Sequence, residues 1–287
     1  MKISQVAANY AWLEQYLHCP LCQKPLHLAA QGSFLCENRH CFDLSKKGYL
    51  NLLPALGGRA MKYQRTLFES RRRIFQAGFY QPVVELLQQM IKAYCQNLSS
   101  ILCLDAGCGE GYYAHALSQF YPPNHLQMIA IDYVKEAILL AAQYHDKTAW
   151  LVGDLTKIPL QDEKITVSLN ILSPANYQEF SRVLTKDGIF IKIIPGISYL
   201  QEIRQSLKGR LQQNEYSNAD VIQHFTERMC LLEQRPIFYQ QDITLEEWQD
   251  FLRMTPMTFG VGDQQLKMPN SGKITIALEC LVGKKKR

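Results

Sequence analysis

A glycine-rich turn near the middle of the chain limits its possible folds more than any other feature. The apolar run 101–104 predicts a buried parallel strand, and three glycines at alternate positions (107, 109 and 111) follow it. Glycine lets the backbone turn tightly and lets a ligand approach the main chain closely. The next segment, 112–120, is compatible with a helix. This order of strand, glycine turn and helix predicts a Rossmann-like unit that binds a ligand at the carboxyl end of the strand.

The rest of the chain continues the alternation of strands and helices. Apolar runs at 128–132, 150–152, 164–172 and 189–194 predict further strands. Two late strands are expected at 236–243 and 273–282, with a helix at 245–253 that has Thr244 as its N-cap. The pattern predicts an α/β fold with a doubly wound, mostly parallel sheet. A Rossmann domain that binds another nucleotide, or none, has the same pattern, so that alternative stays open.

A second feature, upstream, is a set of metal-ligating residues. Cys19 and Cys22 form a C-x-x-C pair, and after a gap of thirteen residues Cys36 and His40 follow. Two such knuckles can close a tetrahedral zinc site, and a site with four protein ligands is structural and not catalytic. Cys41 directly follows His40, so either residue could supply the fourth ligand. Unrelated buried or redox-active cysteines are the alternative.

Composition and charge narrow the class of protein. A chain of 287 residues can hold one core domain and a small module. Nine cysteines without a signal peptide predict a cytoplasmic protein, and no apolar run approaches the length of a membrane span. The net charge of +5 is modest for an enzyme that acts on nucleic acid. Basic residues nevertheless gather at 46–47, 59–65, 71–73 and 284–287, which favours contacts with RNA phosphates over a merely solvated surface.

Together these segments resemble one family, the zinc-binding RlmA-type 23S rRNA (guanine-N1) methyltransferases. The glycine turn with Asp105 resembles motif I of class I S-adenosylmethionine-dependent methyltransferases. The resemblance covers nearly the whole chain from Cys19 onward, and the family has a histidine at position 40. The segments that carry it are the two knuckles, 42–44, 47–54, 72–73, 77–82, 107–113, 195–196 and 254–256.

The resemblance implies an enzyme that transfers a methyl group from S-adenosylmethionine to N1 of a guanine in hairpin 35 of 23S rRNA. One group of this family is linked with macrolide resistance. The implied ligands of one structural zinc ion are Cys19, Cys22, Cys36 and His40. The implied cofactor-binding residues are Tyr80, Asp105, Gly107, Gly109, Glu110, Gly111, Asp132, Asp154 and Tyr199. Among these, Asp132 would accept hydrogen bonds from the ribose hydroxyls and Asp154 would contact the adenine amino group, whereas Tyr80 could instead pack on the first helix of the catalytic domain.

Three parts of the chain are expected. Residues 1–56 would form an N-terminal helix, from Val6 to Leu17, and a zinc-binding module for RNA recognition. Residues 57–73 would form a basic, mobile linker arm with a hinge at Gly57-Gly58. Residues 74–287 would form the class I methyltransferase domain.

The sequence leaves several points open. No general base can be assigned. Only Ser173-Pro174 remains of the pattern found in many amino-methylating enzymes, which argues against a standard adenine-N6 or cytosine-N4 enzyme, and Glu179 and Arg182 are expected to form a structural pair. Which of two neighbouring guanines is modified is not decided, although the pattern leans towards the Gram-positive group, and a homodimer is possible. The alternative functions are methylation of another RNA or a small molecule, or ribosome binding with a degenerate cofactor site.

Overall fold

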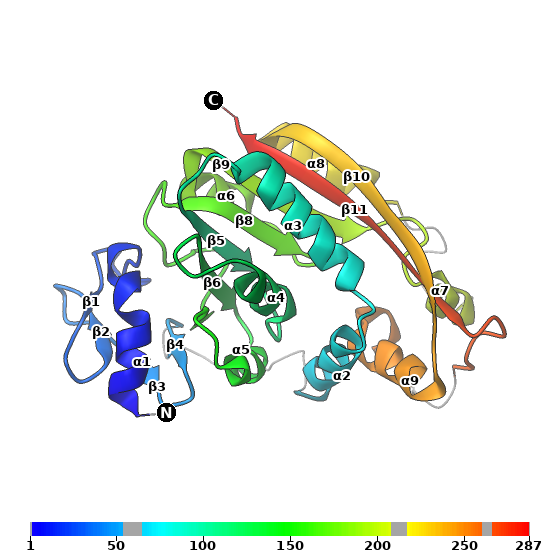
Figure 1. The fold of residues 1–287 in the computed structure, drawn as a ribbon, viewed down its shortest axis with the longest axis horizontal. Coiled ribbons are helices and arrows are strands. Elements are labelled where there is room, and N and C mark those ends of the chain that lie inside the picture. Colours follow the sequence, from blue (N-terminus) through cyan, green and yellow to red (C-terminus); the bar gives the residue numbers. More distant parts are fainter. Residues whose placement is uncertain (1, 54–64, 208–216, 260–265, 287) are drawn as a thin grey trace.

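The fold is built on one large mixed sheet, seen in the computed structural model of Figure 1, which describes residues 2–53, 65–207, 217–259 and 266–286. Over these residues the strand order is β1-β2-β3-β4-β7-β6-β5-β8-β9-β11-β10. The expected hinge at Gly57-Gly58 and the basic residues 59–64 lie outside the described residues.

The centre of the sheet is parallel. Its strands are β5 (Ile101–Ala106), β6 (Leu126–Asp132), β7 (Ala149–Val152), β8 (Ile165–Ile171) and β9 (Leu184–Pro195). Two long strands, β10 (Met229–Asp242) and β11 (Lys273–Lys285), complete one edge, where β11 runs antiparallel to both β9 and β10. The α/β class and the mostly parallel, doubly wound sheet are therefore confirmed.

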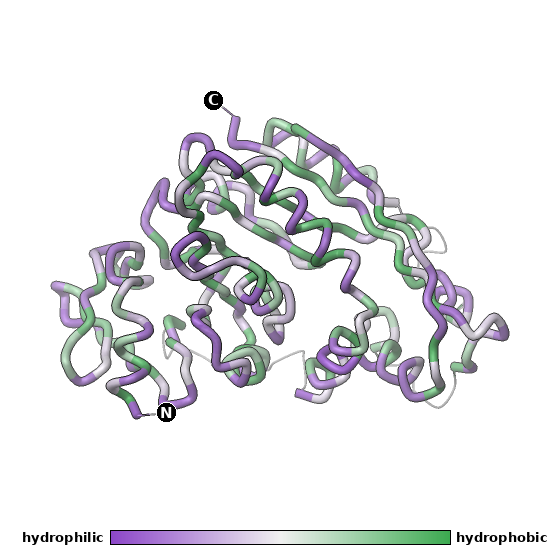
Figure 2. Tube along the Cα trace, viewed as in Figure 1, coloured by the Kyte–Doolittle hydropathy of each residue, from purple (hydrophilic) through white to green (hydrophobic). Residues whose placement is uncertain are grey.

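Helices and apolar side chains cover both faces of this sheet. Because successive strand residues point to opposite faces, Cys103 joins one core while Leu102 and Leu104 join the other. The first core is covered by α2 (Arg65–Gln76), α3 (Gln81–Cys95), α4 (Tyr112–Phe120), α5 (Lys135–Ala141), α7 (Gln201–Ser206) and α9 (Leu245–Met254). The second core is covered by α6 (Tyr177–Val183), α8 (Ala219–Arg228) and the N-terminal module. Figure 2 shows hydrophobic and hydrophilic residues alternating along these helices, as expected where one helical face is buried.

The N-terminal module is joined to the catalytic sheet. It consists of α1 (Ile3–Tyr10), a 3₁₀ turn η1 (Ala11–Gln15), β1 (His27–Leu28), β2 (Ser33–Leu35), β3 (Cys41–Ser45) and β4 (Tyr49–Asn51). Strand β4 pairs in parallel with β7, with Leu50 opposite Leu151 and Asn51 opposite Val152. Residues 2–53 therefore extend the central sheet on the side opposite β10.

Two local predictions can be compared with the structure at the helix ends. The single N-terminal helix expected from Val6 to Leu17 is wrong, because the α-helix ends at Tyr10 and Leu17 instead forms a β-bridge with Leu160. The prediction for α9 is confirmed: the Thr244 side chain accepts a hydrogen bond from the Glu247 main chain in a capping box.

The described part of the expected linker arm is helical. Residues 65–73 belong to α2, whose Leu67 and Phe68 pack against Val134, Ala137 and Leu140 of the α5 segment. The helix also lies against α9, as Figure 1 shows. None of the helices described here is long and apolar enough to cross a membrane.

Candidate cofactor site and metal centre

Cys19, Cys22, Cys36 and His40 converge on one point in the N-terminal module. Their ligand atoms all lie within 4.8 Å of one another. The Sγ atoms of Cys22 and Cys36 are 3.7 Å apart, and the Sγ atoms of Cys19 and Cys36 are each 3.4 Å from Nδ1 of His40. A tetrahedral zinc ion with ordinary Zn–S and Zn–N bonds would need edges of about 3.8 Å and about 3.6 Å, respectively. The four side chains therefore fit a closed zinc site.

Cys41 does not belong to this cluster. Its side chain is exposed, and its Sγ lies 3.6 Å from Oδ1 of Asp43. Strand residues alternate between the two faces, and Cys41 lies on the exposed face of β3 together with Asp43. The choice left open between Cys41 and His40 is thus decided geometrically in favour of His40.

The glycine turn follows β5 and needs its glycines for two physical reasons. Gly107, Gly109 and Gly111 have φ angles of 84°, 57° and 84°, in the left-handed region that favours glycine. A β-carbon on Gly107 would lie 2.2 Å from Oγ of Ser173, and one on Gly111 would lie 2.6 Å from the Trp150 ring. The turn is therefore packed tightly between Ser173 of the loop after β8 and the Trp150 ring of β7.

Asp132 lies at the carboxyl end of β6 and faces this turn. Its Oδ2 accepts a hydrogen bond of 2.9 Å from the main chain of Gly109, and its Oδ1 accepts one of 2.8 Å from Val134. Burial raises the pKa of Asp132, while these main-chain donors act in the opposite direction. The carboxylate of Asp132 is thereby fixed beside Gly109 of the turn.

Two further acids at the turn, Asp105 and Glu110, are buried and carry carboxylate oxygens that have no hydrogen-bond partner among the described residues. Each is only 1% exposed. Within the described chain, no hydrogen bond reaches Oδ2 of Asp105 or either carboxylate oxygen of Glu110. Burial, above all, raises the pKa of each carboxyl group to about 7, and the neighbouring acids contribute to the shift of Asp105. Unpaired buried carboxylates are costly, so this site favours a ligand that carries positive charge.

Arg71 of α2 is a cation whose charge acts on two of the acids at the turn. A β-carbon on Gly109 would lie 3.3 Å from Nη1 of Arg71, and the charge of Arg71 lowers the pKa of both Glu110 and Asp132. The sequence analysis placed Arg71 among residues that contact RNA phosphates and did not connect it with the glycine turn. No local pattern reveals that connection, since it depends on how α2 packs.

Tyr80 and Tyr199 are brought together beside the same site. Their hydroxyl groups form a hydrogen bond of 2.6 Å in the interior. The ring of Phe75 packs edge-on against Tyr80, and the buried hydroxyl of Tyr113 has no partner among the described residues. Tyr113 was not singled out from the sequence, although it lies next to the glycine turn.

Asp154 lies just beyond the end of β7. Its Oδ1 accepts hydrogen bonds of 2.8 Å from both the main chain and the hydroxyl of Thr156. It is partly exposed, unlike Asp105 and Glu110. Since β5, β6 and β7 are parallel neighbours, Asp105 and Asp132, near the carboxyl ends of β5 and β6, and Asp154, just beyond that of β7, lie in this order along the carboxyl ends of the strands.

A buried polar group next to the turn was missed in the sequence. Lys192 of β9 is 4% exposed and donates hydrogen bonds of 2.6 Å to Oδ1 of Asn170 and 3.1 Å to the carbonyl of Ser173. The Asn170 amide in turn donates to the carbonyl of Ala106, over 3.0 Å. Burial lowers the pKa of Lys192 to about 8. This chain of contacts fixes the loop after β8 to the start of the glycine turn.

Comparison with known proteins agrees with both halves of this arrangement. Residues 17–59 match the family described as "RlmA, N-terminal", a zinc ribbon, and residues 98–255 match a family described as "Methyltransferase domain". YxjB of Bacillus subtilis (strain 168), provisionally named a 23S rRNA (guanine-N(1)-)-methyltransferase, is 34% identical over 93% of this chain and 96% of its own length. The chain belongs to the RlmA family of rRNA (guanine-N1)-methyltransferases. A second family member, the 23S rRNA (guanine(748)-N(1))-methyltransferase of Streptomyces fradiae, is 28% identical over 71% of this chain and 72% of its own length.

Membership of this family indicates what the metal centre and the glycine turn are for. The Cys19-Cys22-Cys36-His40 cluster is the metal centre of a zinc ribbon, and the glycine turn lies in the domain that binds S-adenosylmethionine. The buried acids fit this cofactor, because its sulfonium and ammonium groups carry positive charge that would offset the carboxylate oxygens left without a partner among the described residues. The enzyme is therefore an S-adenosylmethionine-dependent methyltransferase with a structural zinc ribbon.

Proposed function

We propose that this enzyme methylates N1 of a guanine in hairpin 35 of 23S rRNA. The observation that carries the methyl-transfer part is the pair of buried acids at the glycine turn, Asp105 and Glu110, since Oδ2 of Asp105 and both carboxylate oxygens of Glu110 lack a partner among the described residues. The guanine-N1 and 23S rRNA parts are supported by the names of the relatives from Bacillus subtilis and Streptomyces fradiae.

Each cofactor-binding residue implied by the sequence has a proposed role. Asp132 accepts hydrogen bonds from the ribose hydroxyls, and Asp154 accepts one from the adenine amino group. The main chain at Gly107, Gly109 and Gly111 lets the cofactor lie close to the turn. The remaining members are the acids Asp105 and Glu110, which face its positive charge, and the tyrosines Tyr80 and Tyr199, which close the site.

S-adenosylmethionine, when bound, supplies a methyl group that its sulfonium centre has already activated. The protein must then hold N1 of the guanine in line with the methyl group that is transferred. N1 of guanine is on the Watson–Crick edge and carries a proton, so the base must be unpaired and must lose that proton around the time of transfer. Flipping a base out costs a few kcal/mol, least where it is already in a loop or bulge.

We place the guanine next to the loop after β8. Ser173 lies against Gly107, so this loop borders the cofactor site. Leu172 adopts a φ of 51°, a strained conformation for a residue with a β-carbon, and the residue is 36% exposed. Strained residues gather at functional sites, and an exposed apolar side chain here offers a surface for a flipped base. No residue is assigned as general base, and loss of the proton to water is compatible with the site.

The zinc ribbon and its lysines are proposed to hold the RNA. Lys46 and Lys47 lie on the exposed turn between β3 and β4. Zinc knuckles and basic side chains are suited to contacts with RNA phosphates. Because the proposed substrate is ribosomal RNA, the proposed location of the enzyme is the cytoplasm. Association of two copies stays a prediction, which light scattering would test.

The decisive experiment compares 23S rRNA from cells with and without the protein. Nuclease digests analysed by mass spectrometry should show one N1-methylguanosine in hairpin 35 that depends on the protein. Purified enzyme should restore it on a hairpin transcript, and replacing the target guanine by adenine should abolish transfer. Position 748, named in the relative from Streptomyces fradiae, and its neighbouring guanine are the positions to examine. Methylation of a small molecule, or of another RNA with the hairpin unmodified, would overturn the proposal.

A further inference from the structure

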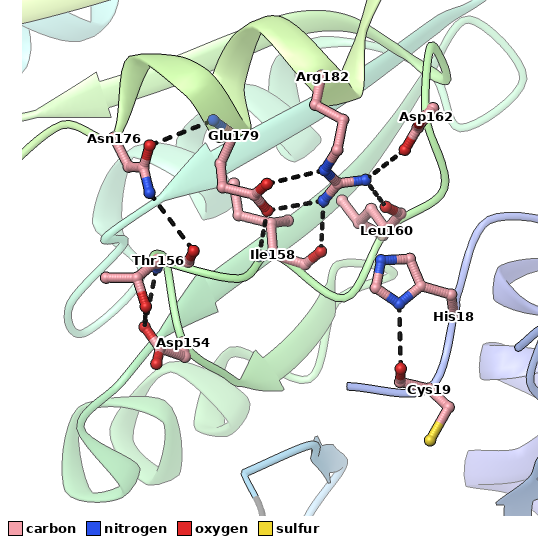
Figure 3. A network of polar contacts seen from close by, with 10 residues as sticks. All are labelled: His18, Cys19, Asp154, Thr156, Ile158, Leu160, Asp162, Asn176, Glu179 and Arg182. Carbon is pink, nitrogen blue, oxygen red and sulfur yellow. Dashed lines mark hydrogen bonds and ion pairs between the residues drawn. The ribbon is translucent and has the colours of Figure 1, made fainter. Parts of the chain in front are cut away.

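The segment 153–161, here called the adenine loop, leaves β7 with Asp154 near its start and returns towards β8. Arg182 of α6 holds the far half of this loop, as Figure 3 shows. Its Nη2 donates to the carbonyl of Ile158 and its Nη1 to the carbonyl of Leu160, both over 2.7 Å. These contacts fix main-chain atoms, so they constrain the path of the loop and not one side chain.

Arg182 is fully used as a donor. Besides the two carbonyls, it donates to Oε1 and Oε2 of Glu179 over 2.8 Å and 2.7 Å, and to Oδ1 of Asp162 over 2.6 Å. These five hydrogen bonds equal the five N–H donors of a guanidinium group. Glu179 in turn accepts a hydrogen bond of 2.7 Å from the main chain of Ile158. The structural pair expected from the sequence is therefore the centre of a larger network around the loop.

The zinc ribbon holds the same part of the loop from the other side. Leu17 and Leu160 form an antiparallel β-bridge. The main chain of His18 donates to the carbonyl of Pro159 over 3.2 Å, and the main chain of Gln161 donates to the carbonyl of Tyr16 over 2.8 Å. His18 directly precedes the zinc ligand Cys19. Leu160 is therefore held by both: the ribbon contacts it through the β-bridge from Leu17, and Arg182 donates to its carbonyl.

The ribbon also fixes the strand that leads into the loop. The main chain of Leu52 donates to the carbonyl of Val152 over 2.8 Å, directly before Gly153. The Tyr10 hydroxyl accepts a hydrogen bond of 2.8 Å from the main chain of Trp150. Both ends of the adenine loop are thus attached to residues 2–53.

Asp154 is the functional group whose position these contacts set. The two hydrogen bonds from Thr156 both use Oδ1, which leaves Oδ2 as an acceptor for a ligand. Asn176 joins the loop to the start of α6 through a hydrogen bond of 3.4 Å to the carbonyl of Thr156. The main chain of Lys157, next to Ile158, donates to the carbonyl of Asp154 over 3.2 Å, so movement of the loop at 158–161 would be passed on to Asp154.

We propose that Arg182 is a positioning residue for the cofactor, which together with the zinc ribbon fixes the adenine loop and so holds Asp154 against the adenine amino group. The ribbon is accordingly a part of the cofactor site as well as a surface for RNA. The inference rests on the proposed function, because it takes Asp154 as the adenine contact.

The test compares two ligands on the full-length, zinc-loaded protein by calorimetry. S-adenosylhomocysteine has the adenine amino group, and S-inosylhomocysteine has a carbonyl oxygen in its place. Arg182→Lys supplies three donors where five are used, so the affinity for S-adenosylhomocysteine should fall about tenfold, as for one lost hydrogen bond to a charged group. The affinity for S-inosylhomocysteine should change far less, because that ligand gives Asp154 no amino group to bind.

The matched control is Arg235→Lys. Arg235 also forms an ion pair with a glutamate, Glu233, over 2.5 Å, but on β10 at the other edge of the sheet. The Arg235→Lys variant should leave the affinities for S-adenosylhomocysteine and S-inosylhomocysteine unchanged. Equal losses for the two ligands in Arg182→Lys, or no loss at all, would overturn the positioning role and leave Arg182 as a general stabiliser of the fold.

A second variant covers the case in which Arg182→Lys does not fold. Tyr10→Phe removes one oxygen atom through which α1 of the N-terminal module contacts β7, and it should weaken S-adenosylhomocysteine binding selectively in the same way. Wild-type affinity for both ligands in Tyr10→Phe would refute the coupling of the N-terminal module to the cofactor site. Wild-type protein that binds neither ligand would instead refute the proposed function, whereas Asp154→Asn with unaltered binding would refute Asp154 as the adenine contact.

Discussion

The hydroxyl groups of Tyr80 and Tyr199 lie 2.6 Å apart and connect the start of α3 with the chain after β9. Tyr80 is completely buried and Tyr199 is 9% exposed. Burial raises the pKa of both side chains, so each stays protonated and one hydroxyl donates to the other. The contact therefore ties two segments that are far apart in the sequence, and we propose that it closes one side of the cofactor site.

This contact predicts a non-additive pair of substitutions. Tyr80→Phe and Tyr199→Phe should each lower the free energy of unfolding by about 1 to 3 kcal/mol, because each leaves the other hydroxyl buried without its partner. The double variant should lose less than the sum of the two, since both polar groups are then gone. Urea unfolding of the four proteins measures the difference. Strict additivity would show that the hydrogen bond does not form in solution.

The metal centre predicts different outcomes for two adjacent residues. His40→Ala should lose stoichiometric zinc, whereas Cys41→Ala should retain one zinc per chain, because the Cys41 side chain is exposed and lies outside the cluster. Zinc binding is worth on the order of 10 kcal/mol in small zinc peptides, so chelation should unfold the ribbon. Elemental analysis and circular dichroism report both effects. Loss of zinc from Cys41→Ala with retention in His40→Ala would reverse the ligand assignment.

The buried acids predict that cofactor affinity depends on pH near neutrality. Burial raises the pKa of Asp105 and of Glu110 to about 7, above the values of the unfolded chain. Their contribution to stability is therefore present at low pH and is lost as the pH rises through about 7, so the cofactor-free protein should lose stability across that range. A cationic cofactor favours the ionised acids, and its affinity should rise over the same range.

Calorimetry from about pH 5.5 to pH 8.5 measures this affinity, and proton release is obtained by comparing buffers of different ionisation enthalpy. Glu110→Gln is the matched variant, because it keeps the shape of the side chain and removes one titrating group. It should flatten the pH dependence. An affinity that is constant with pH in the wild-type protein would contradict the assignment of these acids to the site.

The parts of the fold that sequence analysis predicted depend on local patterns. The run 101–104 and its glycine turn, the Thr244 cap and the spacing of Cys19, Cys22, Cys36 and His40 are each contained in one short stretch of sequence. Hydrophobic periodicity and backbone geometry act over such stretches, so the sequence is sufficient there.

The parts that were missed depend on contacts between distant segments. Nothing local in Tyr49–Asn51 indicates that β4 would pair with β7, and nothing local in Arg182 indicates that it would hold Ile158 and Leu160. The end of α1 was misplaced for the same reason, since the bridge from Leu17 to Leu160 overrides the helical pattern. Sequence-based division of the chain at residue 56 therefore gave no sign that the ribbon contacts the adenine loop.

The basic run of α2 illustrates how a run of charged residues can make contacts within the protein. Arg72 lies over the Tyr144 ring, 4.4 Å from its centre, and donates to the carbonyl of Leu140 over 3.1 Å. Arg73 binds both carboxylate oxygens of Asp250, over 2.7 Å and 2.5 Å. The phosphate contacts expected from the sequence would require these side chains to leave their partners.

Arg73 therefore predicts a loss of stability and not of RNA affinity. Burial alone would raise the pKa of Asp250, but hydrogen bonds from Arg73 and Ser70 outweigh it and lower the pKa. Arg73→Ala should lower the free energy of unfolding by about 1 to 2 kcal/mol, because Asp250 is left buried without its main partner. The loss is modest because Arg73 is half-exposed, and solvent weakens the attraction between the two charges. Lys47→Ala, on an exposed turn, should leave stability unchanged and lower the slope of log affinity for RNA against log salt by about 0.7 to 0.9. Urea unfolding and RNA binding at several salt concentrations measure the two quantities, and a reduced salt slope in Arg73→Ala with full stability would return Arg73 to the RNA interface.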